Sequence, residues 1–268
     1  MGLEKFVKNN QVNIQDTTEF KNNVFQCDNI ELLKRLNDGY VDLIYCDILY
    51  NTGRIFDDYS DKFESTKAAI DFYKPRFIEM KRVLKDTGVI YIQCDYNLSH
   101  YIKILMDEIF GANNFRNEII WWYNSAPRKK KDFGSRHDTI FRYSKSENYF
   151  FNIDSSYIRE DYSATAPRGY AKEKYYNPNG KIIDDVWKIG ILAQNDKTER
   201  VGYSTQKPLK LLYKIIDSSC PIDGIVADFF MGSGTTCIAA KQLNRNYIGC
   251  DISSKSIDIF NKRLIRGG

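Results

Sequence analysis

The sequence predicts an α/β fold, in which one doubly wound, mostly parallel sheet carries helices on both faces. Short apolar runs alternate with helical patterns at both ends of the chain, and this alternation is typical of a parallel sheet. The run at residues 41–46 (VDLIYC) is apolar at nearly every position, as expected of a strand that helices cover on both faces. The chain has 268 residues, enough for one large domain or two small ones with a core of its own.

In the first part of the chain, apolar runs predict strands at residues 24–27, 41–46 and 89–94. Asp28 is placed to cap a helix whose apolar side chains are Ile30, Leu32, Leu33 and Leu36. A second apolar stripe at helical spacing consists of Ile70, Tyr73, Phe77, Met80 and Leu84. Pro75 lies within this stripe and indicates a kink or a late start of the helix. A third helix is expected at residues 101–110.

The pattern changes between residues 113 and 203. Residues 118–123 and 139–143 predict two strands around a basic, glycine-containing loop, more like a long antiparallel hairpin than a crossover. Trp121 and Trp122 lie in the first of these strands and are expected in the core. From about residue 155 to residue 203 the periodicity fades and the chain becomes polar. We interpret this segment as an insertion into one domain, not as an independent domain.

Strand–helix alternation returns in the last part of the chain. Strands are expected at residues 224–229 and 247–250, and helices at residues 208–217, 235–242 and 253–263. Because the same alternation occurs in the first part, both parts are expected to contribute strands to one sheet.

The composition restricts the classes of function. The chain has 39 Lys and Arg against 35 Asp and Glu, a net charge of +4 that permits a polyanionic partner without requiring one. Its six cysteines form no CxxC pair and it has only two histidines, so we expect neither a disulfide framework nor a metal site. No run approaches the roughly 18 apolar residues of a membrane span, and the start of the chain lacks a signal peptide's apolar run. We therefore expect a cytoplasmic protein.

A glycine-containing loop, Asp228-Phe-Phe-Met-Gly-Ser-Gly-Thr-Thr236, lies between a predicted strand and a predicted helix. Gly232 and Gly234 allow a tight turn and a close approach to a ligand, and the following helix offers unpaired N–H groups to an anion. The spacing matches neither GxGxxG nor the P-loop pattern, and no lysine follows the second glycine, which disfavours a nucleoside triphosphate. Taken alone, the loop also fits an ordinary strand-to-helix turn.

An acidic residue, Asp251, follows Gly232 by 19 positions, at the end of the next predicted strand. In a doubly wound sheet a carboxylate in this place can bind two ribose hydroxyls. The alternative is that Asp251 caps the helix that begins at Ser253, and both roles are compatible. The glycine-containing loop and Asp251 together predict a nucleoside cofactor. Its carboxylate end is expected at the loop and its ribose at Asp251.

A second motif, Asp47-Ile-Leu-Tyr-Asn-Thr-Gly53, directly follows the apolar run at residues 41–46. The carboxyl end of a parallel strand is the usual place for a ligand site. There, Asp47 and the Ile48 carbonyl could accept the two hydrogens of an exocyclic amine, while Tyr50 stacks on the ring of a planar heterocycle. The alternative is a polar turn with a packed tyrosine.

These two motifs resemble those of the amino-methylating DNA methyltransferases that use S-adenosylmethionine. Asp47-Ile48-Leu49-Tyr50 is similar to the catalytic signature [Asp/Asn/Ser]-Pro-Pro-[Tyr/Phe] of the family, and Phe230-Met231-Gly232-Ser233-Gly234 to its cofactor signature. The catalytic motif precedes the cofactor motif, which is the order of the beta class. The resemblance covers about residues 24–263. It implies a single methyltransferase domain over residues 1–268, a seven-stranded Rossmann-like sheet, and a target-recognition insertion at about residues 153–203.

The resemblance implies transfer of a methyl group from S-adenosylmethionine to the N6 amine of adenine in duplex DNA, after base flipping. The aspartate at position 47 favours adenine, whereas N4-cytosine is the alternative within the family. The sequence departs from the family at Ile48-Leu49, which replaces Pro-Pro. In the family the base contact made at this position is a backbone carbonyl, which any residue can supply, so we expect activity to survive. The alternative is a DNA-binding homologue that has lost catalytic activity. A restriction–modification role with a separate endonuclease, and a homodimer, are further implications.

The resemblance also implies site residues. Asp251 is expected at the ribose, Asp28 at the adenine of the cofactor and Lys207 at its carboxylate, although a helix cap and an exposed lysine explain the last two equally well. Residues expected around the methionine end are Asp228, Phe229, Phe230, Gly232, Ser233, Gly234 and Thr235. Residues expected to contact DNA are Arg128, Lys129, Lys130, Lys131, Arg136 and His137.

Overall fold

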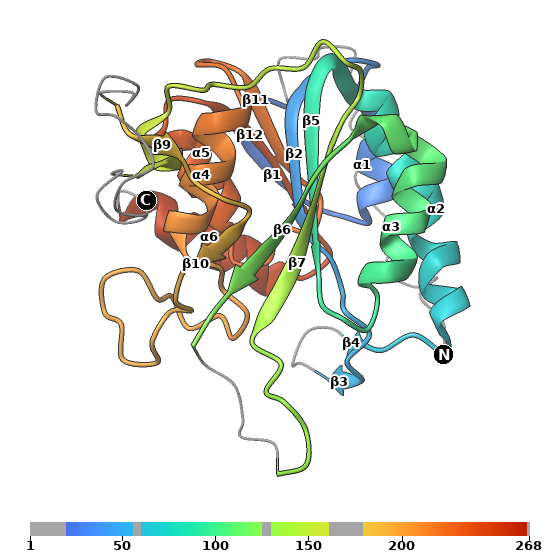
Figure 1. The fold of residues 1–268 in the computed structure, drawn as a ribbon, viewed down its shortest axis with the longest axis vertical. Helices are drawn as coiled ribbons and strands as arrows, with labels where there is room; N and C mark the ends of the chain where they lie inside the picture. Colours follow the sequence, from blue (N-terminus) through green and yellow to red (C-terminus); the bar gives the residue numbers. More distant parts are fainter. Residues whose placement is uncertain (1–19, 56–59, 125–129, 161–178, 267–268) are drawn as a thin grey trace, which may run out of the picture.

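The computed structural model describes residues 20–55, 60–124, 130–160 and 179–266. At its centre lies an eight-stranded sheet with the strand order β1-β12-β11-β2-β5-β7-β6-β10 (Figure 1). Every neighbouring pair is parallel except the two that β7 makes with β5 and β6. The predicted α/β class is therefore confirmed, with a mostly parallel sheet and an antiparallel hairpin.

All seven predicted strands are present, and β10 is an eighth that we did not predict. Three residues are too few to show a period of two, so β10 carries no sequence signal. The strands of the main sheet are β1 Asn23–Gln26, β2 Val41–Asp47, β5 Leu84–Cys94, β6 Phe115–Trp122, β7 His137–Ser144, β10 Val186–Lys188, β11 Ile225–Asp228 and β12 Asn246–Asp251. Two separate strand pairs are β3 Arg54–Ile55 with β4 Ser60–Asp61, and β8 Arg159–Glu160 with β9 Lys181–Ile182.

Helices cover both faces of the sheet, three on each (Figure 1). One face carries α1 Asn29–Arg35, α2 Thr66–Val83 and α3 Ser99–Phe110, and the other carries α4 Leu209–Ser219, α5 Thr235–Gln242 and α6 Ser254–Ile265. Strand β2 shows the reason for two cores: Ile44 and Cys46 are buried on the α1–α3 face, whereas Leu43 and Tyr45 are buried on the α4–α6 face.

Helix α2 begins earlier than its proline suggested. The Ser65 side chain caps it by accepting the N–H of Ala68 at 3.1 Å, and Tyr73 is already buried before Pro75 is reached. Pro75 lies inside the helix, so the expectation of a late start is wrong. The cap and the buried apolar side chains of the first half outweigh the cost of a proline within a helix.

The hairpin of β6 and β7 is antiparallel as predicted, but its two tryptophans differ. Trp121 is buried, and its indole N–H donates to the carbonyl of Ile189 at 2.8 Å. Trp122 is 37% exposed, so the expectation that both lie in the core is wrong. Successive side chains of a strand point to opposite faces, and the face that Trp122 occupies leaves it partly open to solvent.

The carboxyl ends of the parallel strands meet at one edge of the sheet, at the bottom of Figure 1. Strand β2 ends there at Asp47, β11 at Asp228 and β12 at Asp251. The loop of the β6–β7 hairpin projects from the same edge. In the part of the chain that the structure describes, no helix is both long and apolar enough to cross a membrane.

Candidate active site

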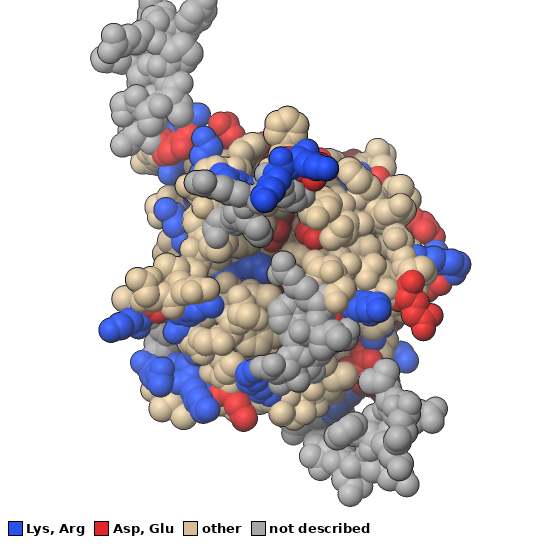
Figure 2. Space-filling view, turned by 90° about the horizontal axis from the view of Figure 1, so that it is seen from below, with Lys and Arg blue, Asp and Glu red and all other residues tan. Residues whose placement is uncertain are grey.

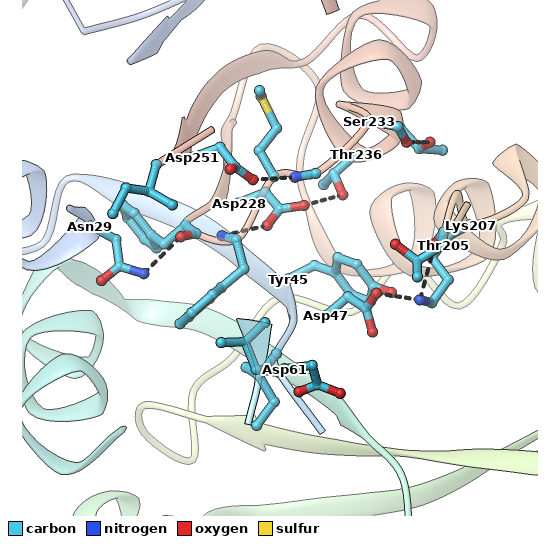
Figure 3. A pocket seen from close by; sticks show the side chains of 18 of the residues that line it. Asn29, Tyr45, Asp47, Asp61, Thr205, Lys207, Asp228, Ser233, Thr236 and Asp251 are labelled. Carbon is cyan, nitrogen blue, oxygen red and sulfur yellow. Dashed lines mark hydrogen bonds and ion pairs between the residues drawn. The ribbon is translucent and has the colours of Figure 1, made fainter. Parts of the chain in front are cut away.

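A single cavity of about 590 Å³ joins the two sequence motifs at the carboxyl edge of the sheet (Figure 3). Its walls include the turn after β2 and the loop between β11 and α5, which lie about 180 residues apart in the sequence. The volume is within the range of small-molecule and cofactor sites, roughly 300–1,000 Å³. The resulting arrangement places a possible ligand between Asp47 at one end and Asp251 at the other.

The carboxylate of Asp47, which ends β2, already has two partners. The Tyr50 hydroxyl donates a hydrogen bond to Oδ1, and the Lys207 ammonium forms an ion pair with Oδ2. Burial raises the pKa of Asp47, and the positive charge of Lys207 opposes this shift. An amine that binds Asp47 must therefore share an oxygen with one of these donors or displace it.

The turn that follows is held by its surroundings, although it lacks prolines. The Ile48 side chain is buried, and its N–H donates to the carbonyl of Gln93 at 3.2 Å. The Tyr73 hydroxyl donates to the carbonyl of Leu49 at 2.8 Å. A proline at position 48 could not make the first of these bonds. The chain thus fixes this turn by packing and hydrogen bonds, where the family signature uses proline rings.

A buried carboxylate that the sequence analysis missed, Asp61, holds the next part of the turn. It accepts the N–H groups of Asn51 at 2.8 Å and of Thr52 at 3.0 Å. Asn51 has a φ of 58°, in the left-handed region that asparagine tolerates better than most residues. Asp61 lies in the short strand β4, which has no sequence signal of its own, so only the fold identifies its role.

A polar network behind Tyr50 was also missed. The buried Asp138, at the second position of β7, accepts hydrogen bonds from Tyr50 at 3.1 Å, from Gln93 at 2.8 Å and from Tyr123 at 3.0 Å. The Tyr45 hydroxyl donates to Gln93 at 2.6 Å. The available signal was Gln93, a polar residue within the otherwise apolar run at residues 89–94, whereas Asp138 lies between His137 and Thr139 and has no such signal.

In the glycine-containing loop, Asp228 is buried and accepts two hydrogen bonds. The N–H of Phe230 donates at 3.0 Å and the hydroxyl of Thr236 at 2.6 Å. Burial raises the pKa of Asp228 to about 7, against the effect of these two bonds. Through these bonds Asp228 ties the loop and the start of α5 to the end of β11. Asp228 also lines the cavity.

The two glycines differ in role. Gly232 has a φ of 52° and lines the cavity. Gly234 has a φ of 75° and is the N-cap of α5, and a Cβ there would lie 2.5 Å from a carbon of Phe260. Gly234 does not line the cavity, so the structure gives it a folding role that only glycine can fill.

Other expected cofactor residues surround the same loop. Phe229 is buried and Phe230 half-buried, and both line the cavity. Ser233 and Thr235 also line it and are buried. The guanidinium of Arg263 in α6 donates to the Ser233 carbonyl at 3.0 Å and to the Thr235 hydroxyl at 2.9 Å. Hydrogen bonds from α6 thus support the loop.

Asp251 lies at the cavity beside the start of α6, but it is not the N-cap of that helix, so the alternative expectation is wrong. It lines the cavity, and it also accepts the N–H of Gly232 at 2.7 Å and the N–H of Ser253 at 2.9 Å. Ser253 itself is the N-cap of α6, so Asp251 supports the helix start without being its cap.

Asp28 and Lys207, the two less specific expectations, both line the cavity. Asp28 caps α1 as predicted and forms an ion pair with the buried Arg76 at 2.8 Å. The side chain of Lys207 is only 12% exposed, because its ammonium contacts Asp47. The alternative that Lys207 is merely an exposed lysine is therefore wrong.

The expected DNA contacts lie on the hairpin loop at the same edge. Lys130, Lys131 and His137 are exposed, and Arg136 is half-exposed. Arg128 and Lys129 lie outside the described residues. Viewed onto this edge, Lys and Arg side chains surround a hollow in the molecule, with acidic side chains between them (Figure 2). Of these expected residues, the four that the structure describes do not line the cavity.

Comparisons with known proteins agree with the geometry. The sequence model of the DNA methylase family matches residues 41–262. The type II methyltransferase M1.MboII of Moraxella bovis is 30% identical over 90% of this chain and 95% of its own length. The DNA adenine methyltransferase YhdJ of Escherichia coli is 30% identical over 87% of this chain and 79% of its own length. The solved structure of the PvuII cytosine-N4-specific DNA methyltransferase has the same fold, with a TM-score of 0.67 and 16% sequence identity. The match covers 91% of this chain and 93% of that structure's chain.

The family model spans both motifs and most of the sheet, and the relatives match nearly the whole chain. The resemblance predicted from the residues is confirmed. On this evidence, the chain belongs to the N6/N4 family of DNA methylases.

Proposed function

We propose that this chain transfers the methyl group of S-adenosylmethionine to the N6 amine of adenine in double-stranded DNA. The observation that carries the proposal is one cavity in which the Asp47–Tyr50 turn faces the Asp228–Thr235 loop. One end can bind a planar base with an exocyclic amine, and the other can bind a nucleoside cofactor. Membership of the DNA methylase family supports both assignments.

The residues present fit S-adenosylmethionine. Asp251 places a carboxylate at the cavity where a ribose is expected, and Phe230 and Phe72 offer ring surface. Lys207 donates to Asp47, and its ammonium has further N–H groups that can serve a carboxylate. When bound, the cofactor supplies a methyl group already activated by a positively charged sulfur. The protein therefore mainly has to position the amine in line with that methyl group.

The amine must first be made nucleophilic, because its lone pair is delocalised into the adenine ring. In our proposal Asp47 and the Ile48 carbonyl each accept one amino hydrogen, which favours a tetrahedral nitrogen with a free lone pair. Tyr50 stacks on the flipped base, and such stacking is worth about 1–3 kcal/mol per base. This offsets part of the cost of base flipping, which is a few kcal/mol.

We propose adenine as the target base because the signature begins with Asp47. The relative YhdJ, which is named a DNA adenine methyltransferase, supports this choice. N4-cytosine transfer is the alternative, since the matching family includes both activities. A lapsed, DNA-binding homologue is a weaker alternative, because the buried turn and its hydrogen bonds remain in place without the prolines.

DNA contacts are proposed for the hairpin loop, with Arg128, Lys129, Lys130, Lys131, Arg136 and His137 facing phosphates. We assign residues 1–268 to one methyltransferase domain with target recognition at about residues 153–203. A homodimer, a separate endonuclease and a cytoplasmic location complete the proposal. The name of M1.MboII, a type II methyltransferase, supports a restriction–modification role.

The test is a transfer assay with labelled S-adenosylmethionine and genomic DNA that lacks amino-methylated bases, followed by digestion to nucleosides and mass spectrometry. We expect N6-methyladenosine, and none with the variant Asp47→Ala. N4-methylcytosine would overturn the choice of base. No methylated nucleoside, together with cofactor binding in calorimetry, would favour the lapsed homologue.

A further inference from the structure

We propose that Asp138 is a positioning residue for the methyl transfer, which takes over the hydrogen bond of the Tyr50 hydroxyl so that Asp47 is released to bind the target amine. This inference rests on the proposed function, since it concerns how the same site accepts its base. It assigns a role to a buried carboxylate that lies in neither sequence motif. Asp138 belongs to β7, and β5 separates it from the strand that carries Asp47.

The Tyr50 hydroxyl lies between two carboxylates. It donates to Oδ1 of Asp47 and also lies 3.1 Å from Oδ2 of Asp138. A phenol has one proton, so it can serve only one of the two acceptors well at a time. Burial and the two nearby carboxylates raise the pKa of Tyr50 well above its ordinary value, so this proton stays on the phenol.

The direction of that proton is restricted by Gln93. The Tyr45 hydroxyl donates to Oε1 of Gln93 at 2.6 Å, which points the Nε2 group toward Tyr50 and Asp138. Nε2 donates to the Tyr50 oxygen at 3.0 Å and to Oδ2 of Asp138 at 2.8 Å. Because the Tyr50 oxygen accepts from Gln93, its own proton must face one of the two carboxylates.

In this structure each oxygen of Asp47 already accepts from one donor, so a target amine that binds Oδ1 has to share that oxygen with the Tyr50 hydroxyl. Lys207 takes Oδ2 and Tyr50 takes Oδ1. If the Tyr50 proton turns from Asp47 to Asp138, Oδ1 is free and the hydroxyl keeps a hydrogen bond. This exchange needs a rotation of one O–H bond and no movement of the ring. The ring can therefore stay in place to stack on the base.

Asp138 is suited to accept the hydrogen bond of the Tyr50 hydroxyl. Its side chain is buried, and the neutral groups of Tyr50, Gln93 and Tyr123 lie within hydrogen-bond distance of it. Asp47, in contrast, is paired with the cation Lys207. The phenol of Tyr50 can therefore turn to Asp138 without displacing a cation once a base competes for Asp47.

The experiment is a double-mutant cycle of Asp138→Asn and Tyr50→Phe, with kcat measured at saturating DNA and cofactor. In the natural background, Asp138→Asn should lower kcat about tenfold, because a neutral amide is a weaker acceptor and the hydroxyl stays on Asp47. In the Tyr50→Phe background there is no hydroxyl to remove. There, Asp138→Asn should change kcat by less than about twofold.

Two outcomes would overturn the inference. One is an equal loss of kcat from Asp138→Asn in both backgrounds, which would mean that Asp138 acts through the fold and not through Tyr50. The other is a Tyr50→Phe enzyme without transfer, since the inference makes the hydroxyl an occupant of Asp47 that must leave. Absence of transfer by the natural chain would instead count against the proposed function itself.

A matched control is available in Asp107→Asn. Asp107 also accepts a tyrosine hydroxyl, that of Tyr143 at 2.6 Å, but it lies on α3 outside the cavity. This variant should leave kcat unchanged in both backgrounds. Calorimetry with S-adenosylmethionine checks the fold of each variant, and Asp138→Asn should bind the cofactor as the natural chain does, because Asp138 does not line the cavity.

Discussion

Among single residues, Asp228 is the one whose protonation should be visible in the stability of the protein. Its pKa is raised to about 7 by burial, whereas an aspartate in the unfolded chain titrates near 3.9. Between these values the folded state binds more protons than the unfolded state. Asp228 therefore lowers the free energy of unfolding as the pH rises from about 4 to about 7, and has no further effect above that range.

We expect the comparison with Asp228→Asn to show this. An asparagine does not titrate, so the stability of the natural chain relative to the variant should decrease between pH 5 and pH 8. Urea unfolding at several pH values measures the difference. If the free energies of unfolding of the two proteins differed by the same amount at every pH in this range, Asp228 would be ionised throughout. Its hydrogen bonds would then offset the effect of burial on its pKa.

The turn at Ile48-Leu49 allows a second prediction at this scale. Ile48→Pro restores a residue of the family signature, yet it removes the N–H that donates to Gln93 and part of a buried side chain. We expect the free energy of unfolding to decrease by about 1–3 kcal/mol, measured in urea. Leu49→Pro removes neither of the two hydrogen bonds of the turn and should cost less. Equal costs would show that the Ile48 bond is unimportant.

At the scale of elements, the β6–β7 hairpin links the network behind Tyr50 to the carboxyl edge of the sheet. Asp138 in β7 and Tyr123 directly after β6 belong to that network, and the loop of the hairpin, which projects from this edge (Figure 1), carries the exposed Lys130 and Lys131. Phe133 on the same loop is 99% exposed. An element that reaches both the hydrogen-bond network behind Tyr50 and solvent is well placed to couple the proposed phosphate contacts to the site.

We expect the double variant Lys130→Ala, Lys131→Ala to weaken binding of duplex DNA of any sequence. Each lost phosphate contact should reduce the slope of log K against log salt by about 1, so the pair reduces it by up to about 2. Fluorescence anisotropy at several salt concentrations measures this. The matched control is Lys34→Ala, Lys241→Ala, two exposed lysines in α1 and α5. An equal effect of the control would assign the loss to net charge alone.

At the scale of the whole molecule, the cavity exists only in the folded chain, because its walls come from distant segments. They include the ends of β2, β11 and β12, residues that follow β1, part of α2 and the segment before α4. A ligand that binds there must stabilise the fold. We expect S-adenosylmethionine at one hundred times its Kd to raise the free energy of unfolding by about 2.7 kcal/mol. Thermal or urea unfolding measures it.

The control for this prediction is ATP, which shares the adenosine but brings a triphosphate to a loop without a P-loop lysine. ATP at the same concentration should stabilise the chain much less. Equal stabilisation by both compounds would contradict the assignment of the Asp228–Thr235 loop to the methionine end of the cofactor.

Much of the fold was predictable because its signals are local. The apolar runs of the seven predicted strands, the Asp28 cap and the spacing of the glycine loop are properties of neighbouring residues. Strand β10 and the start of α2 were not predictable in the same way. Three residues show no period, and the proline suggested a boundary that the packing of Ala69 and Tyr73 overrides.

For the site, the sequence by itself determined the two motifs and thus the chemistry of both ends of the cavity, because the turn and the loop are contiguous. Only the tertiary structure decided what surrounds them. Asp61, Gln93 and Asp138 reach the site from other strands, and Lys207 reaches Asp47 across 160 positions. Hydrogen bonds between distant segments depend on the order and register of the strands, which no local pattern encodes.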